Sequence, residues 1–566
     1  MSLHETVRGV YGPGTFTDTL YTTLPDECRR LLHHFAKISP GFTTDDSILN
    51  NVEFHGGALP IIPGPLKSQA MAAVSHAMIG IVGKEISALK GIDTGKIRID
   101  VDKAGLYPAT VALASIDGKD MAEIGKERIA FHSGTDLDQG VLTNTNMRFR
   151  SWSIYPTRDP NVWYQVLSNL HPVEFLKSYG LDADMSVTKE EAYEIIKAKM
   201  ATYSAAELEQ KNIDHGWCGQ TCYTPEQWRD TEMGKRLQAH PMINCNRVVE
   251  TPNLPPVPFT TSADKRPLAG IKVIEFARVI AGPAMGAALA SLGADVIKVQ
   301  SPNLPDIQSF DLTLTAGKRT FSLDLNVEDD KKKLRTLIED VDVIIQAYRY
   351  RSLERRGFGL NEVLEMANKR GKGVVYLDLN CYGPDGYYAE RPGYQQIADA
   401  ASGCSYVCGK ANGFEDGTPV LPSLPIADML SGAIGVVDVM MALRDRAKVG
   451  GSYHAHVTLT AIDTAQLSPD VGLYPPDIVR RVQENLKFAR MTPELHVEEL
   501  LGVVVNAWKE NSDLLGRDGY MSTFTTAFGK KHSILSPIVE YENNSVSPRW
   551  TSGPVPYCQD TSVTWE

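Results

Sequence analysis

The sequence lacks most features of membrane, secreted and metal-binding proteins. It contains no run of 18 apolar residues, so we expect no membrane span. Its start, MSLHETVRGVYGPGTF, has no basic segment followed by an apolar core, which argues against a secretory signal. Eight cysteines in 566 residues are too few for a disulfide scaffold, and the CxxxC pairs Cys218/Cys222 and Cys404/Cys408 lack partners at zinc spacing. We expect reduced thiols, no metal and a cytoplasmic location, with mitochondria and peroxisomes left open.

Several common catalytic signatures are also missing. There is no P-loop, no GxSxG and no GxGxxG after a predicted strand. His454 and His456 alternate on a predicted strand, and we interpret them as structural. The net charge of −12 argues against a general nucleic-acid or anionic-membrane surface. With 43% hydrophobic and 22% charged residues, the chain is typical of a globular protein with two or more domains.

The most informative stretch is 266–300, RPLAGIKVIEFARVIAGPAMGAALASLGADVIKVQ. An apolar run at 271–276 is followed by the turn Ala281-Gly282-Pro283, a helix of small residues and a second apolar run at 295–299. This order predicts one βαβ unit. Neither run alternates cleanly, as expected of parallel strands that are covered on both faces.

Further strands alternate with helices along the second half of the chain. We predict helices at 328–339 and 361–370, and further strands at 320–325, 341–348, 374–380 and 454–459. Alternating strands and helices indicate an α/β fold with a doubly wound, mostly parallel sheet.

Two segments resemble each other within the chain. Residues 58–110 and 420–466 each contain a Pro-rich lead-in, a helix of small residues, a Gly-containing loop and an alternating strand. Pro65 aligns with Pro425, and we interpret the pair of segments as a diverged internal repeat.

Residues 148–236 predict a separate α/β unit. The segment 161–181 reads as one helix broken at Pro172, and Thr188 is the expected N-cap of a later helix. The stretch ETPNLPPVPFTTSADK, 250–265, is typical of a Pro-rich linker.

The stretch 266–300 resembles the opening of the family III CoA-transferases, the group of formyl-CoA transferase, carnitine CoA-transferase and alpha-methylacyl-CoA racemase. The resemblance implies a Rossmann-like large domain with a smaller α/β domain, and interlocked, ring-like dimers. Because the motif begins near residue 266, we expect a tandem chain that folds as a single-chain pseudo-dimer, either monomeric or as a homodimer. The expected divisions are a degenerate half at 1–147, a small α/β domain at 148–249, the linker at 250–265, the CoA-binding and catalytic domain at 266–470, and a helical and loop segment at 471–566.

Asp428 is the predicted catalytic residue. It stands in Pro425-Ile426-Ala427-Asp428 at the start of a predicted helix, where a carboxylate is expected to stay ionised. By itself this is also the position of an ordinary N-cap. The resemblance places the family's nucleophilic aspartate here, with Ser431-Gly432 completing its motif, whereas the first copy has Ser68 instead. The family's mechanism would form an acyl-aspartyl anhydride from acyl-CoA.

The resemblance also implies contacts with CoA or acyl-CoA, which serve as substrates together with a small carboxylic acid. The matching motifs are the turn after the first strand, AGKRT, IIQAYRYRSLERRGFG and PGYQ. They place the CoA contacts at Ile280, Ala281, Lys318, Arg319, Tyr348, Arg349, Arg355, Gly393 and Tyr394, and a substrate contact at Gln395.

Some positions depart from the family pattern and leave alternatives open. Tyr394 replaces the His of the racemase branch, which favours a transferase, and Gln395 replaces an acid. Gln300 and Gln346 also replace acids of the usual motifs. The alternatives are a lyase of the dimethylsulfoniopropionate type or a racemase that uses Asp428 as a base, and a non-catalytic CoA-binding protein.

Overall fold

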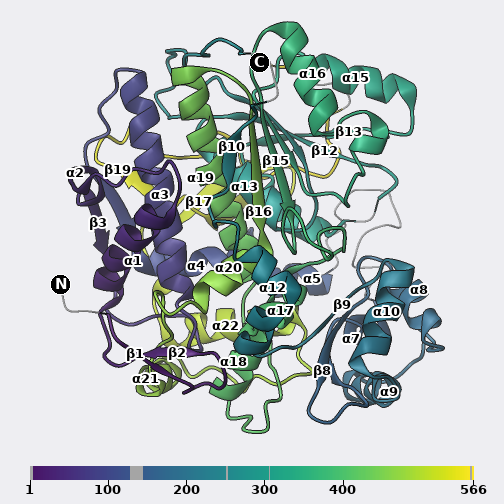
Figure 1. Ribbon diagram of the computed structural model, residues 1–566. Coiled ribbons are helices and arrows are strands. Elements are labelled where there is room, and N and C mark those ends of the chain that lie inside the picture. The colour runs from purple at the N-terminus through teal and green to yellow at the C-terminus, as the bar shows by residue number, and fades with distance from the viewer. Residues whose placement is uncertain (1–3, 128–143, 250–252, 305, 561–563, 566) are drawn as a thin grey trace.

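The largest sheet of the protein has seven strands in the order β10-β16-β15-β14-β11-β12-β13 (Figure 1). All neighbouring pairs are parallel except β10 with β16 at one edge. The computed structural model describes residues 4–127, 144–249, 253–304, 306–560 and 564–565. The mixed α/β fold with a largely parallel sheet agrees with the sequence prediction.

Six of the seven strands lie close to their predicted positions, whereas the edge strand β10 was not predicted. The seven strands are β10 Cys245–Arg247, β11 Lys272–Phe276, β12 Asp295–Gln300, β13 Lys318–Ser322, β14 Val343–Gln346, β15 Val375–Asn380 and β16 Tyr453–Thr458.

Helices cover both faces of the sheet. Successive residues of β11 pack on opposite faces of the sheet, in different apolar clusters. Val273 packs in the cluster that contains α13 (Ala281–Ser291) and α19 (Ile426–Val449). Ile274 packs in the cluster that contains α15 and α16, Glu328–Ile338 and Leu360–Arg370. This two-sided burial explains why the strands read as continuous apolar runs.

The strand order reverses at β11. The chain runs from β11 outward to β12 and β13, then returns to β14 on the other side of β11. In open α/β sheets such a reversal leaves a crevice at the carboxyl ends of the two flanking strands. The segments after β11 and β14 are therefore the natural walls of a ligand site.

The first half of the chain contains a unit with the same order of elements. β3 (Val52–His55), α3 (Ser68–Leu89) and β4 (Ile97–Asp100) come in the same order as β15, α19 and β16, although two further helices lie between β15 and α19. The strands of each unit pair in parallel. The loop after each long helix contains a glycine with positive φ, Gly95 at +67° and Gly451 at +87°.

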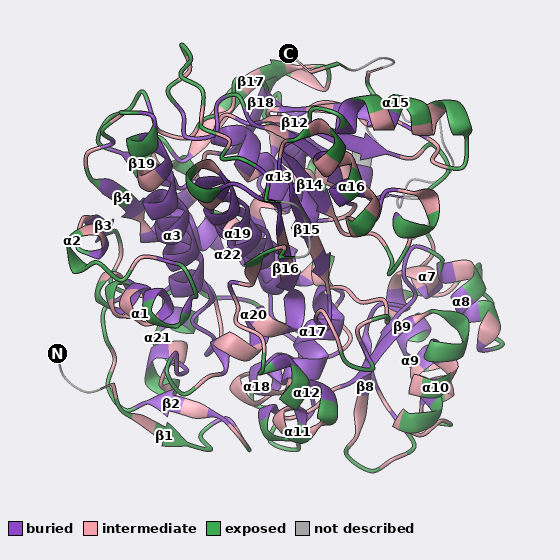
Figure 2. Cartoon of the chain, turned by 45° about the horizontal axis from the view of Figure 1, so that its top comes forward, coloured by how far each residue is buried: buried purple, intermediate pink, exposed green. Residues whose placement is uncertain are grey.

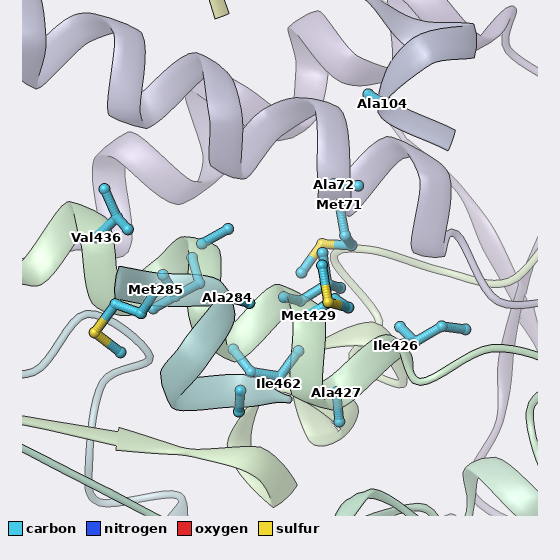
Figure 3. Packing of buried hydrophobic residues seen from close by; sticks show 14 of the residues in the cluster. Met71, Ala72, Ala104, Ala284, Met285, Ile426, Ala427, Met429, Val436 and Ile462 are labelled. Atoms are coloured by element: carbon cyan, nitrogen blue, oxygen red, sulfur yellow. The ribbon is translucent and has the colours of Figure 1, made fainter. Parts of the chain in front are cut away.

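The two long helices pack against each other in the middle of the molecule (Figures 1 and 2). Figure 3 shows Met71 of α3, Met285 of α13 and Met429 of α19 within the apolar cluster that joins them. Both α3 and α19 are long and apolar enough to cross a membrane by length and composition alone. Their most apolar windows are 78% and 100% buried inside the protein, as in the core helices of a globular domain.

A three-stranded antiparallel sheet forms the centre of the smaller unit. Its strands are β7 (Ile154–Pro156), β8 (Trp163–Leu167) and β9 (Cys218–Thr221). The predicted helix over 161–181 is therefore wrong in its first part. The run WYQVL pairs with strands on both sides, and only α8, Pro172–Ser178, is helical. Aromatic and β-branched residues favour a strand once partners are present.

Capped helices surround this small sheet. Thr188 accepts a hydrogen bond from Glu191 N–H and forms a capping box, which confirms the predicted N-cap. Ser204 and Thr224 cap the next two helices in the same way. The three helices are α9 Lys189–Met200, α10 Ala205–His215 and α11 Pro225–Asp230.

The end of the chain returns to the first half. β18 (Gly529–Leu535) pairs with β5 (Ser115–Ile116), and β19 (Val539–Tyr541) pairs with β4. The expectation of helices and loops beyond residue 470 therefore missed strands that complete sheets begun more than 400 residues earlier. The remaining elements are β1 Thr6–Arg8, β2 Phe16–Asp18, α1 Leu24–Ile38, α2 Asp46–Leu49, α4 Val101–Leu106, β6 Lys119–Asp120, α5 Met121–Glu127, α7 Asn146–Arg150, α12 Glu232–Leu237, α14 Asp311–Leu314, α17 Gln395–Ser402, α18 Cys404–Ala411, α20 Leu459–Gln466, α21 Pro476–Leu486, α22 Val497–Asn511 and β17 Met521–Thr526.

Candidate functional site

A cavity of about 350 Å³ opens at the reversal point of the large sheet. Its walls come from the segments that follow β11, β14 and β15. The lining includes Arg278, Val279, Tyr348, Arg349, Asn380, Cys381, Gly393 and Tyr394. The structure thus brings together four predicted CoA contacts, Tyr348, Arg349, Gly393 and Tyr394.

The cavity wall is basic. The Arg278 guanidinium lies over the Tyr348 ring at 5.5 Å from its centroid. Burial raises the pKa of Tyr394, and the positive charges of Arg349 and Arg278 oppose that rise, which places both cations near its phenol. A wall with two guanidinium groups suits an anionic ligand such as a phosphate or carboxylate.

The backbone is strained where it enters the cavity. Val279 has φ +68°, a left-handed conformation that β-branched residues rarely adopt. Its N–H donates to Asp306 Oδ1 at 3.3 Å, which helps to hold this conformation. Such strain costs about 1–3 kcal/mol and concentrates at ligand sites.

Asp428 lies in the first turn of α19. Pro425 is the N-cap, so Asp428 is the third helical residue and not the ordinary cap that the sequence left open. Its side chain is 7% exposed, and burial raises its pKa to about 7. The expectation of a firmly ionised carboxylate was therefore wrong, because loss of hydration outweighs the helix terminus.

Gln395 fixes the start of this helix. Its Oε1 accepts the Asp428 backbone N–H at 2.8 Å, while its Nε2 donates to both carboxylate oxygens of Asp399 at 2.8 Å. Both ends of the buried amide are thus occupied by protein groups. Gln395 holds Asp428 in position, which is a different role from the predicted substrate contact.

Two further buried carboxyls lie behind the predicted nucleophile. Burial raises the pKa of Asp399 well above its usual value and that of Asp463 to about 8, and the Asp428 charge raises both further. The Asp463 charge also raises the pKa of Asp399, so the neutral form of these buried carboxyls is favoured. The sequence analysis missed both residues, although Gln395 and Asp399 stand four apart on one helical face.

The cluster continues to the first half of the chain. Gln466 Nε2 donates to Asp463 Oδ1 at 3.3 Å, and Gln466 Oε1 accepts the hydroxyl hydrogen of Ser68 at 2.7 Å. Ser68 is the residue that aligns with Asp428. Gln466 therefore links the aligned position Ser68 to Asp463, whose pKa the Asp428 charge raises.

Ile280 and Ala281 lie beside α19 and are buried. A Cβ on Gly432, one turn beyond Asp428, would lie 3.1 Å from the Ala281 carbonyl oxygen and 3.0 Å from Ala284 Cβ. The glycine thus permits the close approach of α13 to α19. The residues just before this turn, Arg278 and Val279, line the cavity instead.

The structure does not bring Lys318, Arg319 or Arg355 to the cavity. Lys318 begins β13 at the amino edge of the sheet, is fully buried, and its Nζ lies 2.5 Å from Glu275 Oε2. Arg319 is paired with Asp295 at 2.6 Å. Arg355 is exposed in a short 3₁₀ turn.

The unusual amides have partners within the protein. Gln346 Nε2 donates to Asp378 Oδ1 at 2.7 Å, and its Oε1 accepts the Tyr348 N–H at 2.9 Å. Gln300 Nε2 donates to Asp311 and its Oε1 accepts the Cys558 N–H. Of the two, only Gln346 lines the cavity.

Comparisons with known proteins identify the family of this chain. The family model described as CoA-transferase family III matches residues 268–487. An acyl-CoA transferase of Gibberella moniliformis is 47% identical over 560 residues, covering 98% of this chain and 98% of that protein. An acetyl-coenzyme A transferase of Hypoxylon pulicicidum is 31% identical over 529 residues, covering 89% of this chain and 86% of that protein. A CAIB/BAIF family protein from Brucella suis aligns with a TM-score of 0.40 and 19% identity, over 52% of this chain and 97% of that chain.

Proposed function

Because this chain belongs to the family III CoA-transferases and is a CoA-transferase enzyme, we propose that it moves CoA between two carboxylic acids through an anhydride on Asp428. The observation that carries this proposal is the position of Asp428. Asp428 is a buried carboxylate at the start of α19, and its backbone N–H is held by the side-chain amide of Gln395. Gln395 directly follows Tyr394, which lines the cavity.

In the first step an Asp428 carboxylate oxygen attacks the thioester carbonyl carbon of the donor acyl-CoA. A C–O bond forms, the C–S bond breaks, and CoA leaves as the thiolate. The acceptor carboxylate then attacks the donor acyl carbon of the enzyme anhydride and displaces the Asp428 carboxylate. The thiolate finally attacks the acceptor acyl carbon of this free anhydride, giving the new acyl-CoA and the donor acid.

The cavity provides the binding part of this proposal. Arg278 and Arg349 can bind CoA phosphate or substrate carboxylate oxygens, and Tyr394 lies between them and Gln395. The Hypoxylon relative is named for acetyl-coenzyme A, so we propose a short-chain acyl-CoA as the first donor to test.

We further propose that the first half is a degenerate partner domain, so that the single chain reproduces a pseudo-dimer. α3 packs beside α19, and Ser68 aligns with Asp428 in the sequence. A hydroxyl at this buried site cannot take part in the proposed anhydride chemistry without a base, so one active site per chain is expected.

The test traps the intermediate. Incubation with acetyl-CoA followed by hydroxylamine should convert Asp428 into its hydroxamate, which peptide mass spectrometry locates at this residue. An unmodified Asp428 under conditions of measured CoA transfer would refute the covalent route. A search of the same digest for modified Ser68 checks that only one half reacts.

The activity should depend on pH through Asp428. Only the carboxylate can attack the thioester, and with a pKa of about 7 roughly one tenth of it is ionised at pH ~6 and nine tenths at pH ~8. We expect kcat/KM to rise with pH through about 7. Burial is the cause of this high midpoint, so a single Asp463→Asn change should leave it near 7. A profile flat across this range would contradict the assignment.

A second candidate function uses Asp428 as a general base. A pKa near 7 also suits proton abstraction from the carbon next to the thioester, as a racemase or lyase requires. The two functions differ in a measurable way. Deuterium uptake from heavy water into recovered acyl-CoA, without acceptor acid, supports proton abstraction, whereas transfer to an acceptor without deuterium uptake supports the anhydride route.

A further inference from the structure

Three potential metal ligands meet on one face of the large sheet. Asp378 belongs to β15, and His454 and His456 belong to the neighbouring β16. The parallel register sets Asp378 opposite His456, with His454 two residues earlier on the same face. One carboxylate oxygen and one nitrogen of each imidazole all lie within 4.8 Å of one another.

The existing contacts orient this group. His454 Nε2 lies 2.7 Å from Asp378 Oδ2, and Gln346 Nε2 donates to Asp378 Oδ1 at 2.7 Å. The Gln346 amide thus holds the carboxylate in the way that outer groups commonly orient metal ligands. His456 Nε2 is buried and makes no hydrogen bond to any residue that the structure describes. An ion pair of Asp378 with His454 alone leaves this nitrogen unexplained.

All three side chains line the cavity that also contains Arg278, Arg349 and Tyr394. A coordination position of a bound ion that no protein ligand fills would therefore face the space proposed for the substrate. Imidazole and carboxylate ligands in a set of three suit a divalent first-row transition ion, and an anionic oxygen commonly completes such a site.

We infer that Asp378, His454 and His456 bind one divalent transition-metal ion, with Zn²⁺ as the representative probe, at the cavity wall. This site replaces the sequence-based expectation of no metal. Two alternating histidines gave too little signal by themselves, because the third ligand lies about 75 residues earlier in the sequence, on a different strand. The inference does not depend on the role of Asp428. None of the three residues hydrogen-bonds to Gln395, which holds Asp428 in position.

The test is a direct binding measurement on the whole protein freed of metal with a chelator. Titration calorimetry with Zn²⁺, combined with elemental analysis after dialysis, should give one equivalent per chain. His456→Asn and Asp378→Asn should each weaken this binding at least about 100-fold, and Gln346→Leu about 10- to 100-fold. Bound Co²⁺ should show visible absorption bands in the original protein that His456→Asn removes.

Controls separate this site from other Zn²⁺-binding groups. His215→Asn alters an exposed histidine outside the cavity and should leave the tight equivalent unchanged. Circular dichroism of each metal-free variant checks that it folds. The inference is overturned if the folded protein binds no stoichiometric Zn²⁺, or if His456→Asn and His215→Asn bind it equally well.

Discussion

Replacing Asp428 by Asn should lower the rate of CoA transfer by at least roughly 1,000-fold, because the amide cannot attack a thioester. KM for acyl-CoA should change little, since the cavity wall is intact. The rate of thioester exchange between acyl-CoA and a panel of carboxylic acids measures this effect. Hydroxamate formation at position 428 should disappear in the same variant.

The same change should not destabilise the protein. The pKa of Asp428 is raised by burial to about 7, above its unfolded value near 3.8. Such a carboxyl favours the folded state at low pH, and this contribution is lost as the pH rises through about 7. At pH ~8 the neutral Asn removes a buried charge, so the melting temperature should stay equal or rise.

Asp438→Asn provides a matched control. Asp438 is another buried carboxyl on α19, ten residues further on and roughly 15 Å along the helix, and burial raises its pKa well above the usual value. This variant should keep most of the transfer activity. Equal activity of Asp428→Asn and the original protein would refute both the covalent and the general-base functions.

Replacing Lys318 by Met should cost about 3–5 kcal/mol in the free energy of unfolding. The ammonium is fully buried, and it lies 2.5 Å from Glu275 and 2.7 Å from the Pro283 carbonyl oxygen. Burial lowers the pKa of Lys318 to about 8 and raises that of Glu275. The attraction between the two charges therefore mainly offsets the cost of burying them, and adds little net stability. Removal of the cation leaves Glu275 without its partner in the core.

Denaturant unfolding at neutral pH measures this loss, and the double variant Glu275→Gln/Lys318→Met should recover much of it. At a temperature at which the variant stays folded, KM for acyl-CoA should stay within about twofold, because Lys318 does not line the cavity and its ammonium is paired with Glu275. A stable Lys318→Met protein with a greatly raised KM would instead support the role implied by the family resemblance.

Much of the large domain could be predicted because its signals are local. The apolar runs at β11 and β12, and the helix between them, are determined by residues within one βαβ unit. The strand β8 could not be predicted in this way. Its conformation depends on pairing with β9, which lies about 50 residues later, and a short run such as WYQVL has no clear period by itself.

The candidate site shows the same limit. The position of Asp428 followed from an uninterrupted motif, but its ionisation did not, because the pKa depends on burial by distant elements. Asp399 and Asp463 lie on separate helices, and nothing in their neighbouring residues indicates that they meet. Lys318 matched a motif, yet the sequence could not show that its ammonium forms an ion pair with Glu275.

The packing of α3 against α19 has a consequence during synthesis. Roughly 340 residues separate the end of α3 from the start of α19, and the ribosome adds about 5–20 residues per second. The apolar surface of α3 is therefore completed roughly 15–70 s before the helix that covers it exists. The time between the synthesis of strand β4 and that of its partner β19 is longer still. A nascent chain of this protein therefore exposes the α19-facing surface of α3 for an extended period before its own second half can cover it.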